Sequence, residues 1–185
     1  MMTADQFAAW CLKLKLGESA RALITRIRTS PPSRRVQSRT GNVCVRYPSK
    51  KMGVTIQAES HRNELPLIVE MEHDPAVLEY YDQPSPIKLV YELKSGRKIA
   101  HLHTPDFFVL RSEAAGWTEC KLEEALLALC EKNPTRYVRT DPNSWSCPPA
   151  ERVAQQYGFF YKLRSSAEIN WILQANLAFL EDYFR

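Results

Sequence analysis

Apolar residues at helical spacing mark the first 30 residues of the chain. Thr3 and Gln6 form a capping-box pattern, in which each side chain caps the other's backbone N–H at the start of a helix. Phe7 and Trp10 follow at a spacing that places them on one helix face. A second apolar run over residues 19–28 predicts another short helix. The chain is therefore expected to begin with two helices.

A polar, proline-rich stretch follows these helices. Residues 29–51 are rich in Ser, Pro and Arg, which disfavours regular backbone structure. We therefore divide the chain into a helical leader with a basic linker, residues 1–34, and a body, residues 35–185. In the body, the apolar spacing predicts a helix from Ile56 onward, broken or kinked at Pro66.

The middle of the chain has the alternating or short apolar runs that are typical of β-strands. Ser95–Gly96 is a turn signal between two such runs, so a hairpin is expected there. The pattern predicts strands over residues 77–81, 87–93, 98–103, 107–110 and 117–121.

Helical and strand patterns alternate toward the end of the chain. The expected elements are a helix over 122–130, a long loop over 133–149, a helix over 150–157 and a strand over 159–163. Ser165 and Glu168 form a capping box for a last helix. Its predicted buried stripe consists of Ile169, Ile172, Leu173, Leu177 and Leu180. The element order predicts an α/β fold, a mixed β-sheet core flanked by helices with a short helical N-terminal segment.

Charge is unevenly distributed along the chain. Residues 1–60 hold 11 Lys and Arg against 3 Asp and Glu, whereas residues 61–185 hold 14 against 18. A basic arm beside an acidic body suits a partner that carries phosphates, although it also suits a solvated leader. Five cysteines without C-x-x-C pairs indicate free thiols in a reducing compartment. No apolar run has the length of a membrane helix and no signal-peptide pattern is present, so we expect a cytoplasmic protein without membrane contact.

Two carboxylates and a lysine lie on the predicted strands in the middle of the chain. Asp106 opens one strand, and Glu119 lies thirteen residues later on the next. Because strand side chains alternate, Lys121 points the same way as Glu119 and Cys120 points the opposite way. Adjacent carboxylates repel unless a cation lies between them, and hard oxygen ligands suit Mg²⁺ or Mn²⁺. The pattern indicates a metal site with a lysine that stabilises developing charge. An exposed strand edge with one ion pair is the alternative.

These residues resemble the PD-(D/E)xK nuclease core, with Pro105–Asp106 followed by Glu119-Cys120-Lys121. A longer ordered series over roughly residues 35–185 resembles the N-terminal domain of TnsA endonucleases. It consists of Tyr47-Pro48-Ser49-Lys50-Lys51-Met52, Glu59-Ser60-His61-Arg62-Asn63-Glu64, Glu72-His73-Asp74-Pro75-Ala76-Val77, Gln83-Pro84, Thr104-Pro105-Asp106 and Glu119-Cys120-Lys121. TnsA is the end-cleaving subunit of heteromeric transposases in bacterial cut-and-paste transposons.

The resemblance implies a restriction-endonuclease-like fold, a catalytic domain over residues 35–185 and a role for each motif residue. Glu64, Asp106 and Glu119 would be catalytic metal ligands for Mg²⁺ or Mn²⁺, and Lys121 the catalytic lysine. Some family members have glutamine at the Glu119 position. The implied partners are double-stranded DNA at transposon ends and a TnsB-like transposase. Members of this family contact a TnsC-like ATPase through a domain that follows the nuclease core, and the resemblance does not cover that domain, so the TnsC-like ATPase stays an open partner for this chain.

Two further functions remain open beside cleavage at transposon ends. The chain fits a DNA-binding or assembly module of a transposase complex that does not cut, or a restriction or repair nuclease of the same fold. In each case, the candidates for contacting the DNA backbone are Arg34, Arg35, Arg39, Lys50 and Lys51. A basic linker that only keeps the chain extended is the alternative for these five residues.

Several single residues have competing interpretations. Glu59 and Glu64 are five residues apart, which is about 140° of rotation on one helix, and Glu59 is expected to be an exposed helix acid. Gln83 is expected to be a turn residue before a proline, and the alternative is a hydrogen bond near the metal site or to a phosphate. His101 and His103 form a His-x-His pair without an evident third zinc ligand, so they are expected at the surface or lining the site, with His103 near Asp106.

Cysteine and tryptophan complete the set of candidates. Cys120 is expected to be buried rather than nucleophilic. Trp10, Trp117 and Trp171 are expected in the core. Trp145 lies in the predicted loop with Tyr137, Arg136 and Arg139, where it packs beneath the loop or contacts DNA.

Overall fold

A six-stranded mixed sheet is the centre of the computed structural model, which describes residues 1–34, 44–142, 144–181 and 183. Its strand order is β3-β6-β7-β10-β9-β8. The strands are β3 (Val77–Asp82), β6 (Phe107–Arg111), β7 (Ala115–Lys121), β8 (Val138–Asp141), β9 (Ser144–Ser146) and β10 (Phe160–Ser165). Only β7 and β10 pair in parallel; all other neighbours are antiparallel.

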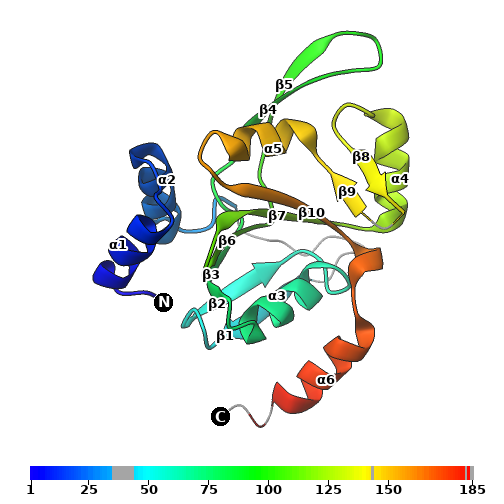
Figure 1. Cartoon of the computed structure of the whole chain (residues 1–185). Helices are drawn as coiled ribbons and strands as arrows, with labels where there is room; N and C mark the ends of the chain where they lie inside the picture. Colours follow the sequence, from blue (N-terminus) through cyan, green and yellow to red (C-terminus); the bar gives the residue numbers. More distant parts are fainter. Residues whose placement is uncertain (35–43, 143, 182, 184–185) are drawn as a thin grey trace.

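Helices and two small hairpins cover the sheet (Figure 1). The helices are α1 (Ala4–Lys13), α2 (Glu18–Thr29), α3 (Glu64–His73), α4 (Glu123–Lys132), α5 (Pro148–Gln155) and α6 (Trp171–Glu181). The hairpins are β1 (Val45–Ser49) with β2 (Val54–Ala58), and β4 (Ile87–Glu92) with β5 (Lys98–His103). The predicted α/β class, with helices beside a mixed sheet and a helical start, is confirmed.

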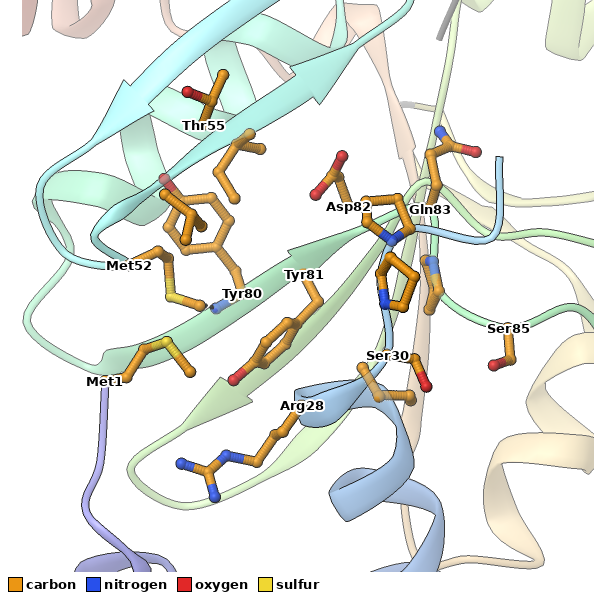
Figure 2. A pocket seen from close by; sticks show the side chains of 16 residues that line it. Met1, Arg28, Ser30, Met52, Thr55, Tyr80, Tyr81, Asp82, Gln83 and Ser85 are labelled. Carbon is orange, nitrogen blue, oxygen red and sulfur yellow. Dashed lines mark hydrogen bonds between the residues drawn. The ribbon is translucent and has the colours of Figure 1, made fainter. Parts of the chain in front are cut away.

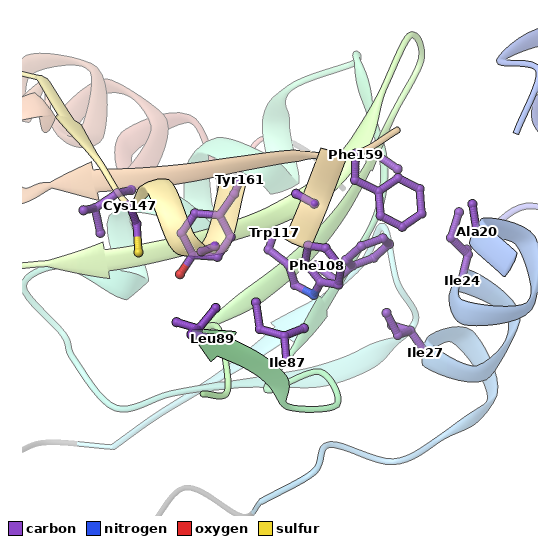
Figure 3. Close-up of a cluster of buried hydrophobic side chains, with 14 of the residues drawn as sticks. Ala20, Ile24, Ile27, Ile87, Leu89, Phe108, Trp117, Cys147, Phe159 and Tyr161 are labelled. Atoms are coloured by element: carbon purple, nitrogen blue, oxygen red, sulfur yellow. The ribbon is translucent and has the colours of Figure 1, made fainter. Parts of the chain in front are cut away.

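Two hydrophobic clusters form, because alternate side chains of the central strands point to opposite faces of the sheet. Phe108 and Trp117 belong to the cluster that also contains Ile24 of α2 and Ala150 of α5 (Figure 3). Phe107 belongs to the other cluster, beneath α3 and the β1–β2 hairpin. The leader therefore packs into the same core as the sheet.

A buried ion pair also ties the leader to the sheet. Glu79 of β3 is fully buried, and Arg28 of α2 donates to both of its oxygens at 2.8 and 2.9 Å. The Met2 amide and the Tyr81 hydroxyl also donate to Glu79. The Glu79 carboxylate thus accepts four hydrogen bonds, and a buried charge needs such partners to offset its loss of hydration.

The β1–β2 hairpin corrects two sequence predictions. Residues 45–49 form a strand instead of irregular backbone, and Ile56 lies in β2 instead of starting a helix. Short-range alternation in β2, where Ile56 and Ala58 are buried and the intervening Thr55 and Gln57 are more exposed, outweighs the weak helical spacing. Pro48 is tolerated because β1 pairs with β2 alone, which leaves its other edge free.

Two proline-based predictions were also wrong. Pro66 does not break α3, because it is the third helical residue and its missing N–H lies among those that have no intrahelical acceptor. The predicted loop over 133–149 contains the short strands β8 and β9 and the first turn of α5. Pro148 and Pro149 begin that helix, where proline is favoured.

The last helix differs most from its prediction. The Ser165–Glu168 capping box is present, but it caps a 3₁₀ turn over residues 166–168, and α6 starts at Trp171. Ile169 is buried, whereas Ile172 is 77% exposed and Trp171 is 59% exposed. Among the described residues α6 contacts α3 through Gln174, and this contact does not cover Trp171 or Ile172, so apolar spacing alone does not bury them. The expected buried stripe and core position of Trp171 are therefore wrong.

No helix within the described residues is long and apolar enough to cross a membrane. All five cysteines are free thiols, and Cys11, Cys120 and Cys147 are buried.

Candidate functional site

Sheet register brings Asp106 and Glu119 together. In the antiparallel β6–β7 pair, Phe107 lies opposite Thr118, so Asp106, one residue earlier, stands opposite Glu119, one residue later. The Cys120 amide donates to Asp106 Oδ2 at 2.7 Å. Both acids are buried. The predicted meeting of these two carboxylates at one end of the strand pair is confirmed.

Two basic side chains hold the Glu119 carboxylate. Lys121 forms an ion pair with Oε1, and His103 Nε2 lies 2.6 Å from Oε2. The Tyr161 hydroxyl donates to Oε2 at 3.3 Å. Burial alone would raise the pKa of Glu119, but the His103 hydrogen bond and the Lys121 charge outweigh it and lower the pKa to about 2. Glu119 is therefore an anion at neutral pH.

Lys121 stays protonated in this environment. Burial disfavours its charge, but the adjacent Glu119 carboxylate outweighs burial and raises the pKa of Lys121 above its usual range. The expectation that Lys121 and Glu119 share one side of β7 is confirmed by their contact. The lysine supplies a fixed positive charge beside the acids.

Glu64 is the first residue of α3 and is buried. Its Oε2 accepts the Glu59 amide at 2.9 Å. Burial raises the pKa of Glu64 to about 7, and the negative charges of Glu59 and Glu119 contribute to the rise; the hydrogen bond and the Arg34 charge oppose it.

Asp106 shares this electrostatic environment. Burial raises its pKa well above the ordinary value, and the charges of Glu119 and Glu64 raise it further. The three acids therefore act on one another. The basic neighbours of Glu119 balance its negative charge, so Glu119 is ionised. Among the described residues, Glu64 and Asp106 lack such neighbours, and their pKa values are raised.

The donor set of Glu64 and Asp106 fits a hard divalent cation, because two acids with raised pKa values are what a cation would relieve. In the described part of the chain, however, no three His, Cys, Asp or Glu side chains are grouped as metal ligands. Both oxygens of Glu119 contact basic side chains instead.

Glu59 occupies a different place from the one predicted. It lies in the bend after β2, not on α3, so the helical rotation argument separating it from Glu64 was wrong. Arg34 pairs with Glu59 at 3.0 Å and donates to Gln83 Oε1 at 2.5 Å. The end of the leader thus reaches the edge of the acidic site.

Gln83 is a turn residue before a proline, as predicted. Its backbone has a left-handed conformation, with φ 44°, and its backbone N–H donates to the Asp106 carbonyl oxygen at 2.8 Å. The side chain is fully buried, and its Nε2 has no hydrogen-bond partner among the described residues. Non-glycine residues in this backbone region are strained, and such strain clusters near functional sites.

The basic residues predicted to contact DNA have separate surroundings. Lys51 donates its ammonium protons to three carbonyl oxygens at the end of α3 and beyond it, of Met71, Asp74 and Val77, at 2.6–2.8 Å. This lysine therefore stabilises a helix end. Lys50 lies exposed beside it in the hairpin turn. Arg34 is engaged as described above, and Arg35 and Arg39 lie outside the described residues.

Three residues near Glu119 come from other elements of the fold. His103 ends β5 and contacts Glu119; the expectation that it lines the site is confirmed. Tyr161 comes from β10 and was not predicted. Arg136, in the turn after α4, places Nη2 3.4 Å from His103 Nδ1. No local pattern indicates these contacts, because they join segments far apart in the sequence.

The structure does not support Cys120 as a nucleophile or Trp145 as a residue that contacts DNA. Burial raises the pKa of Cys120 well above its ordinary value, so the thiol stays protonated and is a poor nucleophile. Trp145 is buried, and its indole nitrogen donates to Glu123 at 2.9 Å, so it packs beneath its hairpin as one expectation held.

A cavity of about 270 Å³ lies away from the carboxylates, between the leader and β3 (Figure 2). Met1, Met52 and Tyr81 are among its mostly apolar lining residues. Asp82 and Gln83 reach its rim, which links it to the strand end before the site.

No protein-family model matches the chain, and no curated protein matches it significantly.

Proposed function

We propose that the chain is a Mg²⁺- or Mn²⁺-dependent DNA endonuclease with a restriction-endonuclease-like core. In this proposal it is the end-cleaving subunit of a TnsA-type heteromeric transposase, and it hydrolyses a phosphodiester at transposon ends. The proposal rests chiefly on one observation: Asp106 and Glu119 face each other across β6 and β7, with Lys121 on Glu119 and the Glu64 charge acting on both acids.

In this proposal, each residue of the site has a separate role in hydrolysis. Glu64 and Asp106 would hold the metal, because burial and the neighbouring carboxylates raise their pKa values and a bound cation would offset both effects. A divalent cation held by these two residues would supply charge relief on the phosphate and activation of a water. Lys121 stabilises the charge that develops on the phosphate. Glu119 keeps the Lys121 ammonium in place through their ion pair.

The expected partners follow from the same proposal. The substrate is double-stranded DNA, bound mainly through backbone phosphates with little sequence reading by the core. A TnsB-like transposase would act with this chain at each transposon end. The proposal does not extend to a TnsC-like ATPase.

Cleavage of a plasmid carrying transposon ends tests the proposal. The full chain is assayed with its partner transposase in Mg²⁺ or Mn²⁺, comparing wild type with Asp106→Asn. The matched control is Asp5→Asn, an exposed acid of α1. We expect Asp106→Asn to lower the cleavage rate by about 100-fold or more and the control to leave it unchanged. Equal rates for all three proteins would contradict the catalytic assignment.

A second candidate function is a DNA-binding or assembly module that does not cut. It is favoured by the contacts of Glu119, whose two oxygens are engaged by Lys121 and His103, and by the lack of a three-ligand metal group among the described residues. In that case Asp106→Asn would support transposase assembly and transposition as well as wild type does.

A further inference from the structure

Two nitrogen-bearing side chains contact the buried Glu119 carboxylate, and a third contacts one of these two. Lys121 pairs with one oxygen, His103 contacts the other, and Arg136 lies behind His103. Lys121 and Arg136 together carry two positive charges against the single charge of Glu119. This group of side chains therefore holds one positive charge more than the Glu119 carboxylate balances.

Arg136 is held in a fixed position. Its turn is closed by the amides of Arg136 and Tyr137, which both donate to the Asn133 carbonyl. The guanidinium lies over the rings of Tyr91 and Tyr137, with centroid distances of 5.3 and 4.9 Å. Nη1 donates to the Tyr91 hydroxyl at 3.3 Å. Aromatic stacking of this kind positions a guanidinium without neutralising it.

The hydrogen-bonding capacity of Arg136 is poorly used. Its Nε is buried and has no partner among the described residues. Its two other contacts, to Tyr91 and His103, are long and involve uncharged acceptor atoms. No carboxylate lies within ion-pair distance of Arg136 in the described part of the chain, although other arginines such as Arg164 have one. A half-buried guanidinium without an anion is unfavourable unless a ligand supplies one.

The direction of the hydrogen bonds connects this arginine to the acids. Arg136 has no acceptor, so it donates to His103 Nδ1. His103 then carries its proton on Nε2, which faces Glu119 at 2.6 Å. The His103 imidazole thus bridges Arg136 and the Glu119 carboxylate, which also pairs with Lys121.

We propose that Arg136 binds a backbone phosphate of double-stranded DNA beside the phosphate that is cut. This inference deepens the proposed function and rests on it for the location of the reaction. The guanidinium fork matches two phosphate oxygens, and the anion supplies the partner that the protein does not. His103 and the Tyr91 and Tyr137 rings orient the fork, while Lys121 remains with Glu119.

Salt-dependent DNA binding tests this contact without requiring cleavage. The full chain binds a labelled transposon-end duplex without added divalent metal, and affinity is measured by fluorescence anisotropy over a series of salt concentrations. Arg136→Gln is compared with Arg139→Gln, which removes the same charge three residues later. Arg139 lies over Trp145, donates to the Pro142 carbonyl and has Glu123 as a counter-charge at 3.8 Å.

We expect Arg136→Gln to weaken binding roughly tenfold and to reduce the slope of log affinity against log salt by about 1, as loss of one phosphate contact does. Arg139→Gln should keep the wild-type affinity and slope. Arg136→Lys keeps the charge, so it should keep the slope while losing part of the affinity. Because the lysine variant retains the positive charge over the rings, it keeps the test valid if Arg136→Gln does not fold.

The inference is overturned if Arg136→Gln matches wild type, if both glutamine variants lose affinity equally, or if the wild type does not bind the duplex. Its failure is distinct from failure of the proposed function. Unchanged binding by Arg136→Gln, together with loss of cleavage in Asp106→Asn, would remove only the phosphate contact. Weakened binding by Arg136→Gln, with cleavage retained in Asp106→Asn, would remove only the catalytic assignment.

Discussion

Replacing Glu64 by Gln should make the metal-free protein more stable at high pH and leave it unchanged at low pH. The side chain is buried, and its Oε2 accepts the Glu59 amide, a bond that the amide oxygen of Gln also accepts. The substitution therefore removes the titrating charge with little change in shape. What it tests is the electrostatic environment of the site, without relying on any cleavage assay.

The sign follows from proton binding in the two states. The pKa of Glu64 is about 7 in the folded protein against an ordinary 4.5, so the folded state binds more protons between these values. Stability of the wild type therefore falls as pH rises through this window. At about 1.4 kcal/mol for each pKa unit, the full loss is about 3 kcal/mol. Asp106 shifts in the same direction, so the wild-type loss is steeper than that of Glu64 alone.

Urea unfolding at several pH values between 4 and 8 measures this difference. We expect Glu64→Gln to match wild type near pH 4 and to exceed it by about 3 kcal/mol at pH 8. The control is Glu131→Gln, an exposed position on α4, which should show no such pH dependence. A stability difference that is the same at both ends of the range would refute the reasoning.

Magnesium extends the same experiment. If Glu64 and Asp106 hold a divalent cation, millimolar Mg²⁺ should stabilise the wild type at pH 8, because ligand binding to the folded state adds to stability. Glu64→Gln should gain much less. Equal gains in both proteins, measured by the urea midpoint, would show that the metal acts elsewhere.

Three further changes test the packing. Arg28→Met leaves the fully buried Glu79 without its counter-charge and should cost about 3–5 kcal/mol by urea unfolding, and a cost below about 1 kcal/mol would count against this ion pair. Gly116→Ala should lower stability by about 1–3 kcal/mol, since an added Cβ would collide with the Phe160 carbonyl and ring; an unchanged melting temperature would contradict this close approach. Ile172→Ser on α6 should change stability by less than about 0.5 kcal/mol because the side chain is exposed, so a large loss would place it in a core.

Local patterns predicted those elements whose determinants lie within a few residues. The Thr3–Gln6 capping box starts α1, and the Ser95–Gly96 turn joins β4 and β5. The prediction was wrong at Ile56, where helical spacing competed with strand alternation. It was also wrong at Pro66, because this proline lies in the first turn of α3 and not in its interior. A proline that breaks a helix interior is harmless in its first turn.

Sequence spacing predicted some residues of the candidate site and missed others. Sequence spacing placed Glu119 and Lys121 on one side of a strand and Asp106 at the start of its neighbour, and the structure brings the three together. Spacing did not place Arg136, which contacts His103 from the turn after α4, or Tyr161, which contacts Glu119 from β10.

The sequence by itself determined the helical start, the strands between Val77 and Lys121, the pairing of Asp106 with Glu119 and the chemistry available there, because strand alternation and hairpin register act over short distances. Only the tertiary structure decided that Glu64 lies close enough to raise the pKa of Asp106, and that Ile172 on α6 stays exposed. Burial and charge interactions depend on which distant segments meet, and the spacing of residues along one segment does not specify that.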